Sequence, residues 1–135
     1  MAKVIEVSFP GGKRVDARIE DVLISIDQSK KNGGEGSAPE PFQLFLASIA
    51  TCAGIYAWQF CQTRHLATEG MALRMVCEFD SSQKRFSTMT LILTPPKGFP
   101  EQYEESILRA MDQCAVKKHI VTPPTFAVKV ERARV

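Results

Sequence analysis

The fold of this chain is decided by residues 33–52, GGEGSAPEPFQLFLASIATC, in which a glycine-rich loop leads through two prolines into an apolar segment. Pro41 suits the first position of a helix, where the N–H that proline lacks has no intrahelical partner. From Phe42 to about His65 the chain has no proline and a single glycine, Gly54. One helix of roughly 24 residues is therefore predicted here, about 36 Å long.

Cys52 lies about three turns inside this predicted helix, and most of its neighbours in the sequence are small residues. Small side chains let another backbone approach closely and leave room beside the sulfur atom. A cysteine in this position is either a reactive group or a small buried hydrophobe. The function of the chain depends on which of the two it is.

Composition limits the function classes. The 135 residues predict a single domain, residues 1–135, with a hydrophobic fraction of 44% and a net charge of +2. That balance does not indicate nucleic acid or a membrane surface as a partner. The N-terminal residues contain no apolar run of signal-peptide length, and no segment has roughly 18 uninterrupted apolar residues. We therefore expect a cytoplasmic protein with mainly reduced cysteines.

The remaining elements follow from apolar periodicity and from turn residues. Strands are predicted at 3–9, 14–19 and 21–27 before the long helix, and at 73–79 and 86–94 after it. A second helix is predicted from Pro100 to the prolines at 123–124. A last strand is predicted to carry Phe126, Val128 and Val130. The resulting order is βββ-α-ββ-α-β, which is typical of an α+β fold with an antiparallel sheet. The long first helix is apolar on most of its sides, so we expect a partner chain to cover part of it.

The four cysteines show no C-x-x-C spacing, and the two histidines lie far apart, so no metal site is predicted. Cys77 is predicted on the inward face of a strand, which it shares with Leu73, Met75 and Phe79, and is interpreted as core. Cys61 is nine residues from Cys52, about 900° along a helix at ~100° per residue, and therefore faces the opposite way. Cys52 and Cys114 are the candidates for chemistry, since each lies on an inward helical face; the alternative is that both are core cysteines.

A reactive cysteine needs a group that stabilises its thiolate. Cys52 is too deep in its own helix to benefit strongly from the helix dipole. We therefore expect a basic side chain from elsewhere, and the first hairpin offers Lys13, Arg14 and Arg18.

Two motifs resemble the OsmC/Ohr family, the osmotically inducible and organic hydroperoxide resistance proteins. The first is P-x-x-L-x-L-A-S-x-A-x-C, from Pro41 to Cys52, and the second is C-x-V-x-K, from Cys114 to Lys118. The resemblance extends through essentially the whole chain and includes the predicted order of elements. It implies an OsmC-like intertwined homodimer, with two long central helices and the sheets wrapped around them.

The resemblance also implies a chemical cycle. A peroxide would oxidise Cys52 to a sulfenic acid, Cys114 would close a disulfide with it, and an external dithiol reductant would restore both thiols. No cofactor or metal is implied. Characterised members carry a glutamate ten residues before the reactive cysteine, which holds an arginine, whereas this chain has Phe42 there. Members of the less studied, YhfA-like type also lack that pair, so the resemblance implies a divergent member of this type.

The positions around Phe42 supply the candidate supporting residues. Glu40 and Gln43 flank the position of the family glutamate, while Arg14 is the first choice for the arginine and Arg18 the second. The aromatic residues Phe42, Phe45 and Tyr56 are expected to line the pocket and to favour an organic peroxide. The alternative function is a dimeric binding module that holds a hydrophobic small molecule at the subunit interface and performs no chemistry.

Overall fold

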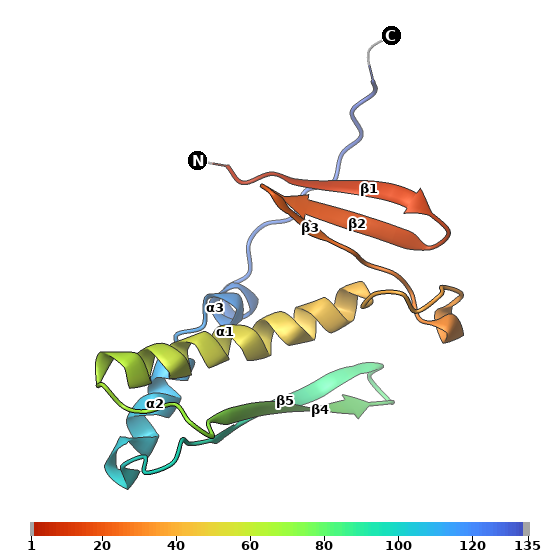
Figure 1. Cartoon of the computed structure of the whole chain (residues 1–135). Helices are drawn as coiled ribbons and strands as arrows, with labels where there is room; N and C mark the ends of the chain where they lie inside the picture. The colour runs from red at the N-terminus through yellow and green to blue at the C-terminus, as the bar shows by residue number, and fades with distance from the viewer. Residues whose placement is uncertain (1, 134–135) are drawn as a thin grey trace. The chain divides into compact units, whose positions relative to one another are not determined.

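The computed structural model describes residues 2–133, and these form two compact units whose boundary falls between Ser48 and Ile49, inside the first long helix. Each unit is described by itself. The elements, labelled in Figure 1, are β1 (Ile5–Gly11), β2 (Arg14–Ile19), β3 (Val22–Ile24), η1 (Lys30–Asn32), α1 (Pro41–Thr63), β4 (Ala72–Asp80), β5 (Arg85–Thr94), η2 (Glu101–Tyr103), α2 (Glu104–Met111) and α3 (Ala115–Val121). The predicted α+β class is confirmed, with antiparallel strands and three α-helices.

The first unit contains a three-stranded antiparallel sheet in the order β1-β2-β3, as the predicted meander requires. Val7 of β1 pairs with Ala17 of β2, which in turn pairs with Ile24 of β3. The apolar side chains of β1 are exposed in the single chain. This sheet therefore presents apolar surface that its own unit does not cover.

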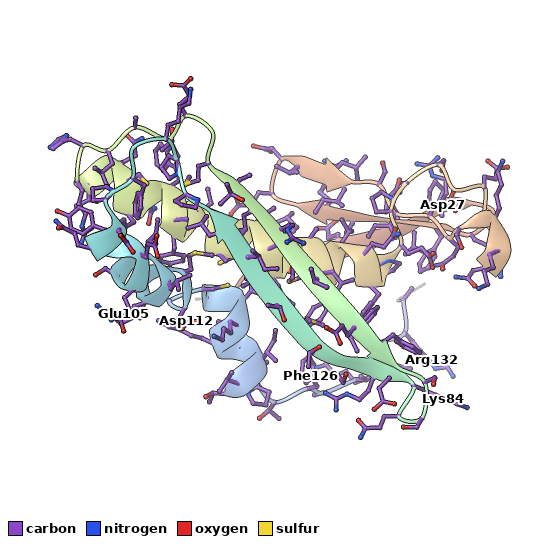
Figure 2. All side chains as sticks on the ribbon, turned by 90° about the horizontal axis from the view of Figure 1, so that it is seen from below. Asp27, Lys84, Glu105, Asp112, Phe126 and Arg132 are labelled. Carbon is purple, nitrogen blue, oxygen red and sulfur yellow. The ribbon has the colours of Figure 1, made fainter. Side chains whose placement is uncertain are left out.

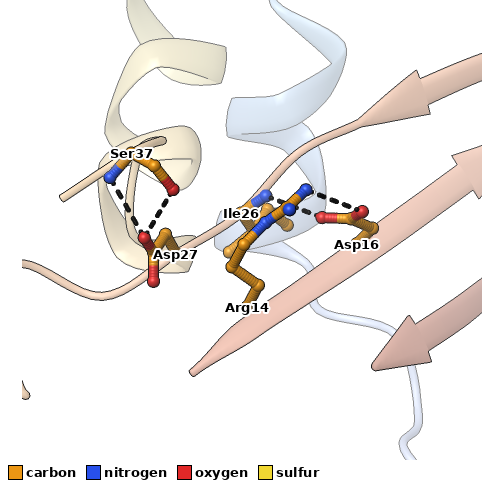
Figure 3. A network of polar contacts seen from close by, with 5 residues as sticks. All are labelled: Arg14, Asp16, Ile26, Asp27 and Ser37. Carbon is orange, nitrogen blue, oxygen red and sulfur yellow. Dashed lines mark hydrogen bonds and ion pairs between the residues drawn. The ribbon is translucent and has the colours of Figure 1, made fainter. Parts of the chain in front are cut away.

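The loop between β3 and α1 is organised by Asp27, whose residue surface is only 1% exposed. Its carboxylate accepts hydrogen bonds from the backbone N–H of Gln28 at 2.7 Å and from the backbone N–H and hydroxyl of Ser37 at 3.0 and 2.6 Å (Figure 3). The hydroxyl of Ser37 is the largest cause that lowers the pKa of Asp27. A single buried carboxylate thus fixes the loop that leads into α1.

The start of α1 is fixed by Gln43, whose side-chain oxygen accepts a hydrogen bond from the backbone N–H of Glu40 at 2.9 Å. This is half of a capping box, in which a side chain in the first turn satisfies a free N–H at the helix start. Pro41 is the first helical residue, as predicted. Because α1 begins where the sequence indicates, Cys52 has the predicted depth in the helix.

The second unit is built around the later part of α1. Its core consists of Ala53, Ala57, Phe60 and Cys61 from α1 together with Ile107 and Met111 from α2. Leucines 73, 91 and 93 from the β4–β5 hairpin pack against this core. A Cβ atom at Gly54 would lie 3.6 Å from Leu73 Cδ2, an ordinary contact with a side chain.

Three predictions about elements were wrong. The second helix is divided into α2 and α3 by a turn at 112–114, so Cys114 does not lie on the inward stripe of one continuous helix. No strand follows α3 within the described residues, where the ribbon is drawn without an arrow around Phe126 (Figure 2). Phe126, Val128 and Val130 are 83%, 100% and 90% exposed. Phe79 does not share the inward face of β4, because the pairing with β5 shifts between Glu78 and Phe79.

The missing last strand has a physical reason. A strand needs an edge that pairs its backbone N–H and C=O groups, and no such edge accepts residues 125–133 in the single chain. The alternating apolar residues that predicted the strand are present, but an alternating pattern alone forms no hydrogen bonds.

Candidate active site

The candidate active site lies in the second unit, where Cys52 of α1 meets the junction between α2 and α3. Cys52 is half-buried, and Cys114 is buried with an exposed fraction of 1%. Both cysteines are free thiols. The structure thus brings together the two cysteines that the sequence selected and leaves Cys61 apart from them in the core.

Cys114 is placed by the turn that separates α2 from α3. The turn is held by hydrogen bonds from the N–H of Gln113 to the carbonyl of Ala110 at 3.1 Å and from the N–H of Cys114 to the carbonyl of Met111 at 3.4 Å. Cys114 then adopts an extended backbone, with φ −48° and ψ 122°, and becomes the N-cap of α3. Its sulfur accepts a hydrogen bond from the backbone N–H of Lys117 at 3.4 Å.

An ion pair spans this turn. The Lys117 ammonium donates to Asp112 Oδ1 at 2.6 Å, and thereby links the first residue of the turn to the first turn of α3. Figure 2 labels Asp112 at this junction. Both side chains are partly exposed, so the pair contributes little to stability, about 0.2–1 kcal/mol. Its effect is to hold the turn that carries Cys114.

The two thiols have opposite acid–base properties. The pKa of Cys52 is lowered, first by the hydrogen bond from the Cys114 thiol, then by the backbone N–H of Val116, with a smaller contribution from Ala115. The pKa of Cys114 is raised, first by burial and then by its interaction with Cys52. Cys52 is therefore the group that ionises first, while Cys114 stays protonated and donates to it.

This arrangement changes the expectation about what activates Cys52. The sequence indicated that a basic side chain was required, because Cys52 is remote from the start of its own helix. The structure instead supplies N–H groups of Ala115 and Val116, at the start of another helix, α3. Sequence reasoning missed these groups because the break that creates them contains no proline or glycine, and cysteine is an uncommon N-cap.

The proposed supporting residues all belong to the first unit. Arg14 forms an ion pair with Asp16 at 3.3 Å (Figure 3), and Arg18 pairs across the sheet with Glu6 and Leu23. Glu40 accepts a hydrogen bond from Asn32 Nδ2 at 2.9 Å. These contacts give Arg14 and Glu40 partners within their own unit, and the roles of all four supporting residues at the cysteine site stay predictions.

The predicted pocket aromatics fall into two groups. Phe42 and Phe45 contact each other in the first unit with ring centroids 5.3 Å apart, and both remain exposed. Tyr56 belongs to the second unit, is half-buried and lies one helical turn after Cys52. Tyr56 is therefore the aromatic residue that the structure places near the cysteine pair.

The sequence matches the family model of OsmC-like proteins over residues 34–129. No curated protein matches it. Among solved structures, an osmotic stress-induced and detoxification response protein from Psychrobacter arcticus is 19% identical, with 84% of this chain and 85% of that chain covered and a TM-score of 0.71. An organic hydroperoxide resistance protein OsmC from Legionella pneumophila is 17% identical, with 89% of each chain covered and a TM-score of 0.60.

The organic hydroperoxide resistance protein OhrB of Bacillus subtilis is also similar, at 17% identity, with 88% of this chain and 90% of that chain covered and a TM-score of 0.54. At these identities the structures establish the fold. The family model covers more than half of the chain and includes both Cys52 and Cys114. The chain therefore belongs to the family of OsmC-like proteins, the OsmC/Ohr family.

Proposed function

We propose that this protein is a thiol-dependent peroxidase that reduces organic hydroperoxides through a cycle of Cys52 and Cys114. The observation that carries the proposal is the opposite direction of the two pKa shifts, which gives a thiolate at Cys52 and a neighbouring thiol at Cys114. A two-cysteine peroxidase needs one thiol with a low pKa and one with a high pKa, because one sulfur must attack the peroxide as a thiolate while the other stays protonated.

In the first step, the Cys52 thiolate attacks the distal oxygen of the hydroperoxide. The S–O bond forms as the O–O bond breaks, so Cys52 becomes a sulfenic acid and the substrate leaves as an alkoxide, which takes up a proton to give the alcohol. The N–H groups of Ala115 and Val116 hold the thiolate before the attack. They are backbone groups of a structured helix and need little rearrangement.

In the second step, Cys114 attacks the sulfenic sulfur, a disulfide forms and water leaves. Part of what raises the pKa of Cys114 is the charge and the hydrogen bond of Cys52. Oxidation of Cys52 removes that negative charge, so the pKa of Cys114 falls when its thiolate is needed. The resolving cysteine is thus activated by the product of the first step.

In the third step, an external dithiol reduces the disulfide by thiol exchange and is itself oxidised. The sum of the cycle is one hydroperoxide and one dithiol converted to one alcohol, one water and one oxidised dithiol. The cycle uses no cofactor and no metal ion. The proposed location is the cytoplasm, where dithiol reductants are available.

The substitution of the family glutamate by Phe42 is compatible with this cycle. In characterised members that glutamate holds an arginine, whereas here the backbone of α3 supplies hydrogen-bond donors to Cys52. Arg14, and after it Arg18, are proposed to add positive charge in the assembled protein. The substitution also makes this position apolar, which supports an organic substrate over an inorganic one.

The proposed assembly is a homodimer. On α1, Phe42, Ile55 and Trp58 are exposed in the single chain, although they are large and apolar. A helix with this exposed apolar surface needs a partner that buries it, and α1 of a second copy presents the same apolar surface.

A second candidate function is a dimeric binding module for a hydrophobic small molecule. The observation that favours it is the exposed pair of Phe42 and Phe45, whose rings contact each other at a tilt of 38° at the start of α1. In this alternative the two cysteines pack without reacting.

The two functions are separated by counting thiols before and after one equivalent of cumene hydroperoxide. The peroxidase loses two thiols per chain and yields a peptide that links Cys52 with Cys114. Cys114→Ser is expected to stop at a sulfenic acid on Cys52 that dimedone traps, and to over-oxidise with excess peroxide. If all four thiols remain titratable while hydrophobic ligands still bind, the peroxidase is excluded and the binding module is supported.

Cys61→Ser and Cys77→Ser are the matched controls. Cys61 is buried in the core and its pKa is raised by burial, while Cys77 is on β4 opposite Met89 of β5. Neither substitution is expected to change the number of thiols lost.

A further inference from the structure

A polar groove of about 550 Å³ lies between the later turns of α1 and the helix α2. Its lining includes the guanidinium groups of Arg64 and Arg109 and the polar side chains of Gln59, Ser106 and Gln113. Among the described residues that line it there is no aspartate or glutamate. A group inside the groove therefore meets two fixed positive charges and several hydrogen-bond donors.

Arg64 is held in place by aromatic rings. Its guanidinium carbon lies 3.7 Å from the centre of the Phe60 ring and 5.7 Å from the centre of the Tyr103 ring. Phe60 is buried and contacts Tyr103 edge to face, with centroids 5.9 Å apart. Stacking uses the face of the guanidinium and leaves the N–H groups at its edge to bind a ligand.

Arg109 is oriented from the opposite side of the groove. One of its nitrogens donates to Ser106 Oγ at 3.3 Å, and another lies 4.0 Å from Glu105. That ion pair is long and exposed, so it competes weakly with a ligand. The guanidinium retains further N–H donors for an oxyanion.

Neither cysteine lines the groove, although two lining residues are near them in sequence: Tyr56 lies one helical turn after Cys52, and Gln113 directly precedes Cys114. Binding in the groove therefore depends on the arginines and not on the cysteine pair.

We propose that this groove binds a small molecule through a carboxylate or phosphate group, which Arg64 and Arg109 hold from two sides. Arginine is suited to both groups because its planar fork matches two oxygen atoms at once. The inference stands apart from the peroxidase, because binding requires neither cysteine to react.

The test is to titrate the ¹⁵N-labelled full chain separately with phenyl phosphate, benzoate and benzamide, and to monitor binding through the amide chemical shifts. Either anion is expected to give saturable chemical-shift changes in residues 106–113. The dissociation constants of phenyl phosphate and benzoate then show whether phosphate or carboxylate is preferred. Benzamide has the same ring without the charge and is expected to bind at least about tenfold more weakly. Equal binding of benzamide, or no saturable shift with either anion, would overturn the proposal.

Variants then assign the site. Arg64→Gln and Arg109→Gln are each expected to weaken anion binding about tenfold, because each removes a charge-assisted hydrogen bond. Arg64→Lys keeps the charge without the planar fork, so its anion affinity is expected to lie between those of Arg64→Gln and the natural chain. This intermediate affinity separates loss of binding from loss of folding. Arg85→Gln, in the β4–β5 hairpin, is the matched control and is expected to leave binding unchanged. Unchanged affinity in both Gln variants would also overturn the proposal.

Discussion

At the scale of single residues, the proposed chemistry depends on the different surroundings of two like side chains. Cys52 and Cys114 are both cysteines on helical segments, but hydrogen bonds lower the pKa of the first while burial raises that of the second. Cys61 is fully buried, and its pKa is also raised. Exposure and hydrogen-bond donors, rather than residue type, decide which thiol reacts.

The pH dependence of alkylation tests this assignment. In a Cys61→Ser, Cys77→Ser background, the rate of Cys52 modification by iodoacetamide is expected to rise at lower pH than for a free cysteine, whose pKa is about 8.5. A lowered pKa keeps Cys52 ionised to a lower pH than a free cysteine, and reactivity is lost as the pH falls through that lowered pKa. The measurement is the labelled fraction of each peptide by mass spectrometry from pH 5 to 10. A midpoint at or above that of free cysteine would contradict the lowered pKa.

Gly34 is a second position where a single residue decides the local structure. A Cβ atom there would lie 2.1 Å from the carbonyl oxygen of Gln28 and 2.8 Å from Asp27 Oδ1. Gly34→Ala is expected to lower the free energy of unfolding by about 1–3 kcal/mol, because the loop backbone must move to relieve the contact. Urea denaturation followed by circular dichroism measures the change.

Gly54→Ala is the control for this substitution. Its Cβ would meet only Leu73 Cδ2 at 3.6 Å, an ordinary contact. Since alanine favours a helix over glycine by about 1 kcal/mol, we expect no loss of stability there. Equal destabilisation by both changes would argue against a specific clash at Gly34.

At the scale of elements, the break between α2 and α3 creates the site. A continuous helix would have buried its N–H groups in its own hydrogen bonds, whereas the start of α3 leaves those of Ala115 and Val116 free to reach Cys52. The Asp112–Lys117 ion pair and the Cys114 N-cap hold this start in place.

Ala115→Pro tests the contribution of α3. Proline is accepted at the first position of a helix and removes the N–H of that residue. The extended ψ of 122° at Cys114 is compatible with a following proline. We expect the pKa of Cys52 to rise and its alkylation at pH 7 to slow, while Ala115→Gly retains the N–H and changes the rate little. If Arg14→Ala slows alkylation and Ala115→Pro does not, the activation comes from the arginine.

At the scale of the whole molecule, the single chain leaves much apolar surface uncovered. α1 is long and apolar enough to cross a membrane by length and composition, and 28% of its most apolar window is buried within the chain. The core helix of a soluble protein passes the same test, and the OsmC/Ohr resemblance implies a second subunit as the cover. Burial of apolar surface at about 25 cal/mol per Å² would make such an assembly persistent.

We therefore expect sedimentation to show a dimer down to low micromolar concentration, with no folded monomer. The segment with Phe126, Val128 and Val130 alternates like a strand but pairs with no strand among residues 2–133. Removal of residues 125–135 is expected to weaken the dimer by at least about tenfold, since an added strand contributes backbone hydrogen bonds and apolar burial. A Lys84→Ala control in the β4–β5 turn should leave assembly unchanged. A stable monomer of the intact chain would contradict the homodimer.

The sequence by itself determined those features that depend on local pattern. Proline at position 41 and the apolar run after it determined α1, and alternating apolar residues determined the paired strands β4 and β5. The spacing of the motifs around Cys52 and Cys114 selected the two of the four cysteines that the structure brings into contact. These features are predictable because hydrogen bonds or side-chain periodicity within a short segment create them.

Only the tertiary structure decided how that site works. The turn at 112–114 carries no proline or glycine, so nothing in the local pattern predicts that α3 begins after Cys114 and directs its N–H groups to Cys52. The arginine groove likewise depends on Phe60 and Tyr103, which are 43 residues apart in sequence and in contact through the fold. Contacts between distant segments arise from packing, and the sequence pattern of either segment alone does not predict how the two segments pack.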